Sequence, residues 1–212
     1  MSKKSYKDYL DKTFLEELNY KIWITKGCRF NASSRLVRMG KLSNLALNMI
    51  SVYLTIAGLL TVYNISSPIV DNNLLAYLIT SLSIVALVFG QIENSKDYSL
   101  KARDFHNCGL ELSEIYNELR IFKTLEDDSS IEKKRQMALD ISHKYQRVLE
   151  KYDNHLPIDN RLEQSKTPKY HELSQLQVIR FRIEYYFATQ FLFHTLIVIP
   201  AIFITVILFY KN

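Results

Sequence analysis

Two long stretches without a charged residue constrain this chain more than any other feature. Residues 42–70 and 72–92 contain no Asp, Glu, Lys or Arg, and only Asp71 separates them. About 20 residues of helix, at ~1.5 Å rise per residue, cross the ~30 Å hydrocarbon core of a bilayer. Polar, turn-forming residues lie between the runs. We therefore predict a transmembrane hairpin of two helices, about 42–63 and 74–92.

A third stretch, Tyr185 to Tyr210, is also free of charge, and it predicts a C-terminal membrane helix over 187–210 that Pro200 would kink. The rest of the chain is dense in charged residues. Such segregation is typical of an integral membrane protein rather than of a globular enzyme. The predicted fold is therefore all-α, with every apolar run helical.

Basic residues indicate the orientation of the hairpin. Residues 1–41 carry ten Lys or Arg against four Asp or Glu, whereas residues 65–73 carry only Asp71. Lys96, Lys101 and Arg103 follow the second run closely. Because Lys and Arg are enriched in cytoplasmic segments, we expect the N-terminus and the central region to be cytoplasmic. The chain is therefore expected to cross a membrane several times.

We divide the chain by these patterns into four segments. The first is an N-terminal cytoplasmic amphipathic helix with a basic juxtamembrane part, and the second is the transmembrane hairpin. The third is a cytoplasmic helical region, and the fourth is the C-terminal transmembrane helix. Their predicted ranges are 1–41, 42–92, 93–186 and 187–210.

Apolar spacing predicts the helices outside the membrane. A first helix runs from Tyr6 to Lys26, and Gly27 is expected to end or bend it. A packing helix is one interpretation, and a membrane-surface helix is the other, because Tyr20 and Trp23 suit an interface.

Two heptad-like seams predict a cytoplasmic antiparallel hairpin, joined by an acidic turn at residues 125–130. Residues 157–172 contain two prolines and many polar side chains, so we predict a loop there. Helical spacing resumes at Leu173. The two seams consist of Phe105, Cys108, Leu112, Ile115, Leu119 and Phe122, then Ala138, Ile141, Tyr145, Val148, Tyr152 and Leu156.

Polar and small residues form a stripe along the first membrane helix. They recur at spacings of three and four, so they lie within about a quarter of the helical circumference. Asparagine is costly against lipid, so this face should meet protein or water. The stripe either packs helix against helix or lines a pore in an oligomer. Its members are Asn44, Asn48, Ser51, Thr55 and Gly58.

Four basic residues approach the first span: Arg29, Arg35, Arg38 and Lys41. Their long stems can lie along apolar surface while their charged ends reach lipid phosphates. We expect them to anchor the topology through headgroup contacts. Binding of a soluble anionic signal is the alternative.

Recognisable enzyme chemistry is absent from the sequence. The five glycines form no phosphate-binding loop, and His106 and Cys108, two apart on a helix, point in different directions. We therefore expect no catalytic residue, no metal and no cofactor. The excess of basic charge lies beside a membrane span, where it favours anionic headgroups over direct nucleic-acid binding.

Two regions resemble the SLATT domain family. The first is Cys28-Arg-Phe-Asn-Ala-Ser-Ser-Arg-Leu, with Lys41-Leu-Ser-Asn-Leu-Ala-Leu and Ser51-Val-Tyr-Leu. The second is Glu93-Asn-Ser-Lys-Asp-Tyr, with Lys101-Ala-Arg-Asp-Phe-His and Ile115-Tyr-Asn-Glu-Leu. The resemblance implies a bacterial two-span membrane protein with cytoplasmic helices, acting as an effector of defence systems that include nucleotide-signalling synthases, SLOG-type sensors or reverse transcriptases.

Pattern and resemblance together predict a homo-oligomeric effector of antiphage defence that forms a pore or disrupts the membrane in abortive infection. Its cytoplasmic helices would gate it. The alternative is a membrane-anchored adaptor subunit that tethers a partner defence enzyme, such as a reverse transcriptase or a nucleotide-signalling enzyme, without forming a pore.

Overall fold

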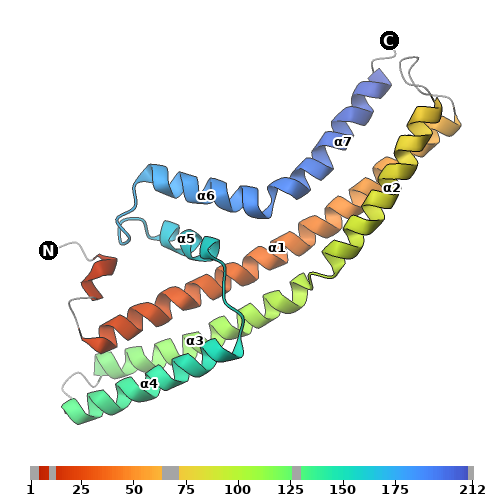
Figure 1. The fold of residues 1–212 in the computed structure, drawn as a ribbon. Helices are drawn as coiled ribbons and strands as arrows, with labels where there is room; N and C mark the ends of the chain where they lie inside the picture. Colours follow the sequence, from red (N-terminus) through yellow and green to blue (C-terminus); the bar gives the residue numbers. More distant parts are fainter. Residues whose placement is uncertain (1–4, 10–12, 64–71, 126–129, 210–212) are drawn as a thin grey trace. The chain divides into compact units, whose positions relative to one another are not determined.

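The computed structural model describes residues 5–9, 13–63, 72–125 and 130–209 (Figure 1). The predicted turn between the membrane helices, the acidic turn at residues 126–129 and residues 10–12 of the predicted N-terminal helix lie outside these ranges. The described elements are η1 (Tyr6–Tyr9), α1 (Phe14–Val62), α2 (Asn72–Asn94), α3 (Tyr98–Leu125), α4 (Ile131–Lys151), α5 (Pro157–Lys166), α6 (Gln175–Thr189) and α7 (Phe191–Phe209).

The all-α prediction is confirmed, because the described residues form helices and no strand. Two helical regions are long and apolar enough to cross a membrane: α1, and α2 together with α3. Only 11% and 0% of their apolar windows are buried, so these windows are not the dry interior of a water-soluble bundle. The pair α6 and α7, interrupted at Gln190, would make a third span.

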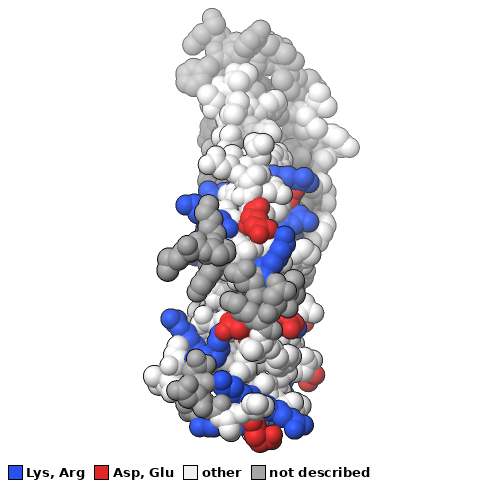
Figure 2. Space-filling model, turned by 90° about the vertical axis from the view of Figure 1, so that its left-hand side faces the viewer, with Lys and Arg blue, Asp and Glu red and all other residues white. Residues whose placement is uncertain are grey.

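Charge is unevenly distributed over the surface. On the face drawn in Figure 2, Lys, Arg, Asp and Glu gather over one part, while the other part carries none among its described residues. Apolar side chains in the uncharged stretches are widely exposed. Leu82, Val85 and Leu87 of α2, for example, are 55%, 62% and 66% exposed. Exposed apolar surface of this extent suits hydrocarbon rather than water as the solvent.

Helix α1 does not end at Gly27, as the sequence suggested, but continues through Gly27 and Gly40 to Val62. A Cβ added at Gly27 would overlap the carboxyl group of the Glu163 side chain in α5. The Glu163 side chain therefore occupies the space that a Cβ would take at Gly27, and this glycine lies inside the helix and not at its end. The predicted end of the helix was wrong because composition cannot separate these two uses of glycine.

The loop predicted over residues 157–172 was also wrong in its first part, since α5 occupies Pro157–Lys166. Pro157 is at the first helical position, where a missing N–H costs nothing. The Asp159 carboxylate accepts a hydrogen bond of 3.0 Å from the Leu156 N–H and so caps the helix. Proline here starts a helix instead of breaking one.

The chain divides into two compact units. Unit 1 comprises residues 1–37 and 99–186, and unit 2 comprises residues 38–98 and 187–212. Helix α1 contributes its first part to unit 1 and its second part to unit 2.

The core of unit 1 joins α1, α3 and α4. The two predicted seams largely face this core, although Leu156 is 50% exposed. Leu18 and Ile22 of α1 complete it. Its buried members are Leu18, Ile22, Cys108, Leu112, Ile115, Leu119, Ile141 and Val148.

Aromatic residues hold the start of the chain against the segment between α5 and α6. The Trp23 ring stacks on His171 with ring centroids 6.1 Å apart, and the Tyr6 ring lies 5.6 Å from His171. The Tyr6 N–H donates to the Tyr170 carbonyl at 2.9 Å. Burial lowers the pKa of His171, against opposing hydrogen bonds from the backbone. Trp23 therefore packs inside unit 1, which favours the packing interpretation of the N-terminal helix over the membrane-surface one.

The core predicts a contrast between two neighbouring leucines of α3. Leu112 is fully buried, whereas Leu110 is 47% exposed. Leu112→Ala should lower the free energy of unfolding by about 2–5 kcal/mol, because it leaves a cavity. Leu110→Ala, the same chemical change, should cost less than about 1 kcal/mol. Denaturant titration of helicity in detergent measures both, and equal losses would contradict the assigned core.

Candidate functional site

The polar stripe of α1 lies on an open face of unit 2. Asn44, Asn48, Ser51 and Thr55 are all exposed. A Cβ added at Gly58 would meet no atom within 4 Å. The structure thus brings the five predicted residues onto one face, and no other helix of the described chain covers that face.

The hydroxyl groups in the stripe bond to their own helix. Ser51 donates to the Leu47 carbonyl at 3.0 Å, and Thr55 donates to the Ser51 carbonyl at 2.9 Å. Such back-bonding lets a hydroxyl lie in an apolar environment at low cost. The side-chain amides of Asn44 and Asn48 have no such local solution, so they remain the groups that most require water or a protein partner.

The opposite face of α1 carries the packing inside unit 2. Tyr53 and Ala57 lie there, beside residues of α2 and α7. Leu47, four residues before Ser51 and therefore next to the stripe, lies 3.6 Å from a Cβ built at Gly90 of α2. The Tyr53 hydroxyl donates to the Ile197 carbonyl of α7 at 2.7 Å. The neighbouring carbonyl, that of Leu196, has no helical N–H partner, because residue 200 is proline. Packing between helices therefore uses Tyr53 on the far side of α1 and Leu47 at the edge of the stripe, while Asn44, Asn48, Ser51 and Thr55 stay exposed.

A cavity of about 430 Å³ lies among α1, α2 and α7 of unit 2. Aliphatic and aromatic side chains line it, including Leu54, Leu82 and Phe203. Its one polar side chain, Tyr53, already donates to Ile197. The lining offers hydrocarbon contacts and no acid, base or nucleophile.

A buried carboxylate closes α1 onto the end of α2. Glu93 is 3% exposed and accepts hydrogen bonds from Ser43 at 3.0 Å and from Tyr98 at 2.9 Å. Lys96 is its ion-pair partner. A buried carboxylate is stable when it is paired and hydrogen-bonded in this way. Reasoning from the sequence passed over Glu93, although its position directly after an apolar run was a visible signal.

A second polar junction joins α1 to α5 in unit 1. Arg35 and Asp159 form a two-pronged ion pair, with Nε to Oδ1 at 2.9 Å and Nη2 to Oδ2 at 3.0 Å. Their side chains are 7% and 0% exposed. Parallel hydrogen bonds between a guanidinium and a carboxylate are strong and fix orientation. The pair therefore sets the rotation of α1 against α5.

Asn31 extends this junction by one helical turn. Its side-chain amide donates to the Asp159 carbonyl at 3.0 Å and to Glu163 at 2.8 Å. Lys166 bridges back, donating to Asn31 at 2.6 Å and to Glu163 at 2.7 Å. The contact between α1 and α5 is thus polar, although it is mostly buried.

Arg29, two residues before Asn31, is fully buried. It donates to the Asp153 carbonyl and, at 3.2 Å, to Asn154, and its guanidinium lies 5.7 Å from the Phe105 ring centroid. Its Nε has no hydrogen-bond partner among the described residues. Burial, followed by the nearby Arg29 charge, lowers the pKa of His155. A buried guanidinium with one unsatisfied N–H is costly, so this part of unit 1 lowers the stability of the fold.

The four predicted basic contacts divide into two pairs. Arg29 and Arg35 lie in the interior of unit 1, where other groups of the chain engage their guanidinium groups. Arg38 and Lys41 are exposed at the start of unit 2. Contact with lipid headgroups or with a soluble anion stays a prediction, and only the second pair is placed to make it in this arrangement. The spacing of the basic residues could not reveal which of them had a carboxylate partner more than 120 residues away.

Within the described ranges, no group of three or more His, Cys, Asp or Glu side chains is arranged to hold a metal ion. Both cysteines, Cys28 and Cys108, are buried and form no disulfide.

These features define a class: an α-helical membrane protein whose first spanning helix is shared with a polar, helical extramembrane unit. The chain matches the family model described as SMODS and SLOG-associating 2TM effector domain family 5, SLATT_5, over residues 11–208. It therefore belongs to the SLATT family. No curated protein and no solved structure matches it.

The junction predicts a large effect from a small change. Asp159→Asn leaves the buried Arg35 charge unpaired and should lower the free energy of unfolding by about 3–5 kcal/mol. Glu184→Gln, which breaks exposed pairs with Arg161 and Arg180, is the control and should have a much smaller effect. Denaturant titration in detergent compares the two. If Asp159→Asn cost no more than Glu184→Gln, the proposed weight of the buried pair would be wrong.

Proposed function

We propose that this protein is a membrane effector of bacterial antiviral defence that assembles as a homo-oligomer and opens a pore. The observation that carries the proposal is the open polar stripe of α1. Its asparagines are exposed, whereas Tyr53 and Ala57 on the opposite face of the same helix lie against α2 and α7. Asparagine amides facing hydrocarbon would be costly, so a symmetric ring of α1 helices around water relieves the cost.

The family description supports the biological setting. It names an effector domain with two membrane helices that associates with SMODS and SLOG. For the present chain we propose that a partner enzyme or sensor of this kind supplies the activating cue. Loss of the ion gradient would then stop growth of the infected cell, which is the abortive outcome.

Gating follows from the length of α1. This helix carries both the Arg35–Asp159 junction and the stripe, and it is uninterrupted from Phe14 to Val62. A change in packing at α5 would therefore rotate or shift the same helix that presents Asn44 and Asn48. A few kcal/mol of differential binding to the two arrangements is enough to switch such an equilibrium.

The orientation that we propose places the N-terminus and the central helices in the cytoplasm, with the protein in the inner membrane. The ten Lys and Arg residues before the first span support it. We also propose that the chain is not an enzyme. In this account the helices of unit 1 move α1 and do not bind a substrate.

Removing one amide should remove the leak. Asn48→Leu should insert and assemble normally but release little or no dye from liposomes in the presence of partner and signal. Ser83→Leu on the exposed side of α2 is the control and should leak like the native chain, because Ser83 lies outside the stripe. Unchanged leak in Asn48→Leu would count heavily against a lined pore. A native chain that never permeabilises liposomes would instead favour the tethering adaptor.

Charge at the same position should set ion selectivity. A ring of carboxylates favours cations and a ring of ammonium groups favours anions. Asn48→Asp and Asn48→Lys should therefore move the reversal potential, measured across a planar bilayer under a salt gradient, in opposite directions. Shifts of the same sign, or no shift in either variant, would show that Asn48 does not face the conduction path.

A further inference from the structure

Helix α6 has an apolar ridge that is largely exposed. Leu176, Ile179, Ile183 and Phe187 are spaced three, four and four residues apart, so they share one side of the helix. Their exposed fractions are 79%, 53%, 50% and 56%. Four large apolar side chains in a row at such exposure are unusual for a helix in contact with water.

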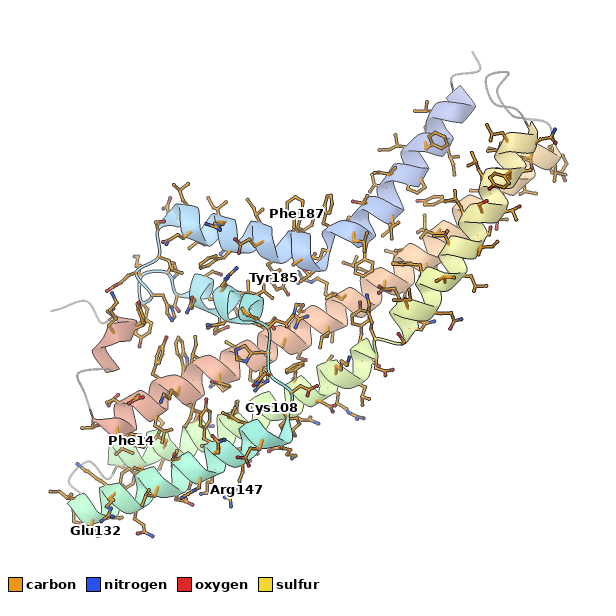
Figure 3. All side chains as sticks on the ribbon, viewed as in Figure 1. Phe14, Cys108, Glu132, Arg147, Tyr185 and Phe187 are labelled. Atoms are coloured by element: carbon orange, nitrogen blue, oxygen red, sulfur yellow. The ribbon has the colours of Figure 1, made fainter. Side chains whose placement is uncertain are left out.

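The other side of α6 is already in use. Tyr185 is 9% exposed, and Val178 and Phe181 are partly buried. Phe187 and Tyr185 extend from opposite sides of the helix (Figure 3). Glu184 ties α6 to α5 through Arg161 at 2.7 Å and bonds along α6 to Arg180 at 2.8 Å. The helix is therefore fixed by one face and presents the apolar ridge on the other.

The ridge is continuous along the chain with a membrane segment. Gln190 alone separates α6 from α7, and the two helices together qualify as a broken span. The Phe187 and Phe191 rings bridge this break, with centroids 4.7 Å apart. Arg180 and Arg182 are exposed on the flanks, and Tyr186 is near the end that enters α7. Basic flanks with aromatic residues at one end suit the boundary between headgroups and acyl chains.

We propose that α6 lies at the surface of the bilayer, with the ridge of Leu176, Ile179, Ile183 and Phe187 immersed at the boundary of headgroups and acyl chains. The occupant of this face is lipid, with Arg180 and Arg182 directed to its phosphates. The ridge faces away from α5, and the chain leaves α6 directly into hydrocarbon, so lipid is the surface within reach. The contact makes α5, and through it the Arg35–Asp159 junction, sensitive to the state of the membrane.

The test measures local immersion, so its result does not depend on whether the protein forms a pore. Both native cysteines are buried, so an introduced surface cysteine can be labelled selectively with an environment-sensitive fluorophore. Leu176→Cys and Ile183→Cys report the ridge. Val198→Cys in α7 reports the membrane interior, and Gln146→Cys on the exposed side of α4 reports water. The full chain is reconstituted in vesicles of phosphatidylcholine and phosphatidylglycerol, part of which is brominated near the top of the acyl chain.

The expected result is quenching at Leu176→Cys and Ile183→Cys that exceeds quenching at Gln146→Cys by a factor of about three or more, as for a helix ~5–10 Å deep in the boundary region. Quenching at the two ridge positions no greater than at Gln146→Cys would overturn the proposal. A second outcome would also overturn the proposal. Copies labelled at Ile183→Cys could show energy transfer that falls on dilution with unlabelled protein, without any quenching by lipid. The ridge would then be a contact between subunits.

Discussion

The structure depends on the cost of placing an unpaired polar group in hydrocarbon. A backbone that crosses a bilayer must satisfy its N–H and C=O groups within itself, so each uncharged run becomes helix. The same cost moves every charged residue out of those runs. It also explains why the hydroxyl groups of Ser51 and Thr55 bond back to their own helix, and why the Tyr53 hydroxyl donates to the Ile197 carbonyl of a helix that contains proline.

Outside the apolar runs, the stabilising interactions change in kind. Unit 1 has an apolar core between α1, α3 and α4, but its contact between α1 and α5 is built from Arg35, Asp159 and Asn31. Buried ion pairs contribute less net stability than apolar packing, yet they tolerate little misalignment. A contact of this kind fixes one rotation of α1. That property suits a helix whose far part carries the proposed conduction stripe.

Several elements could be read from the sequence because they depend on local physics. The apolar windows, the seams of α3 and α4 and the common face of Asn44, Asn48, Ser51, Thr55 and Gly58 follow from residue type and helical period alone. Gly27 and Pro157 were misinterpreted, since each has two structural uses that composition does not separate. Glycine marks a helix end or a close contact, and proline marks a break or a first turn.

The sequence by itself determined that the chain is helical, that hydrocarbon surrounds part of it and that the polar residues of the first span share a face. The period of the α-helix and the transfer cost of charge act on residues near one another in the chain, so no tertiary information was needed. Only the tertiary structure decided which basic residues are buried, because Arg35 meets a carboxylate 124 positions later. It also decided that the stripe lies on the exposed side of α1 and that α6 has an exposed apolar side, since burial of a face depends on contacts with segments distant in the sequence.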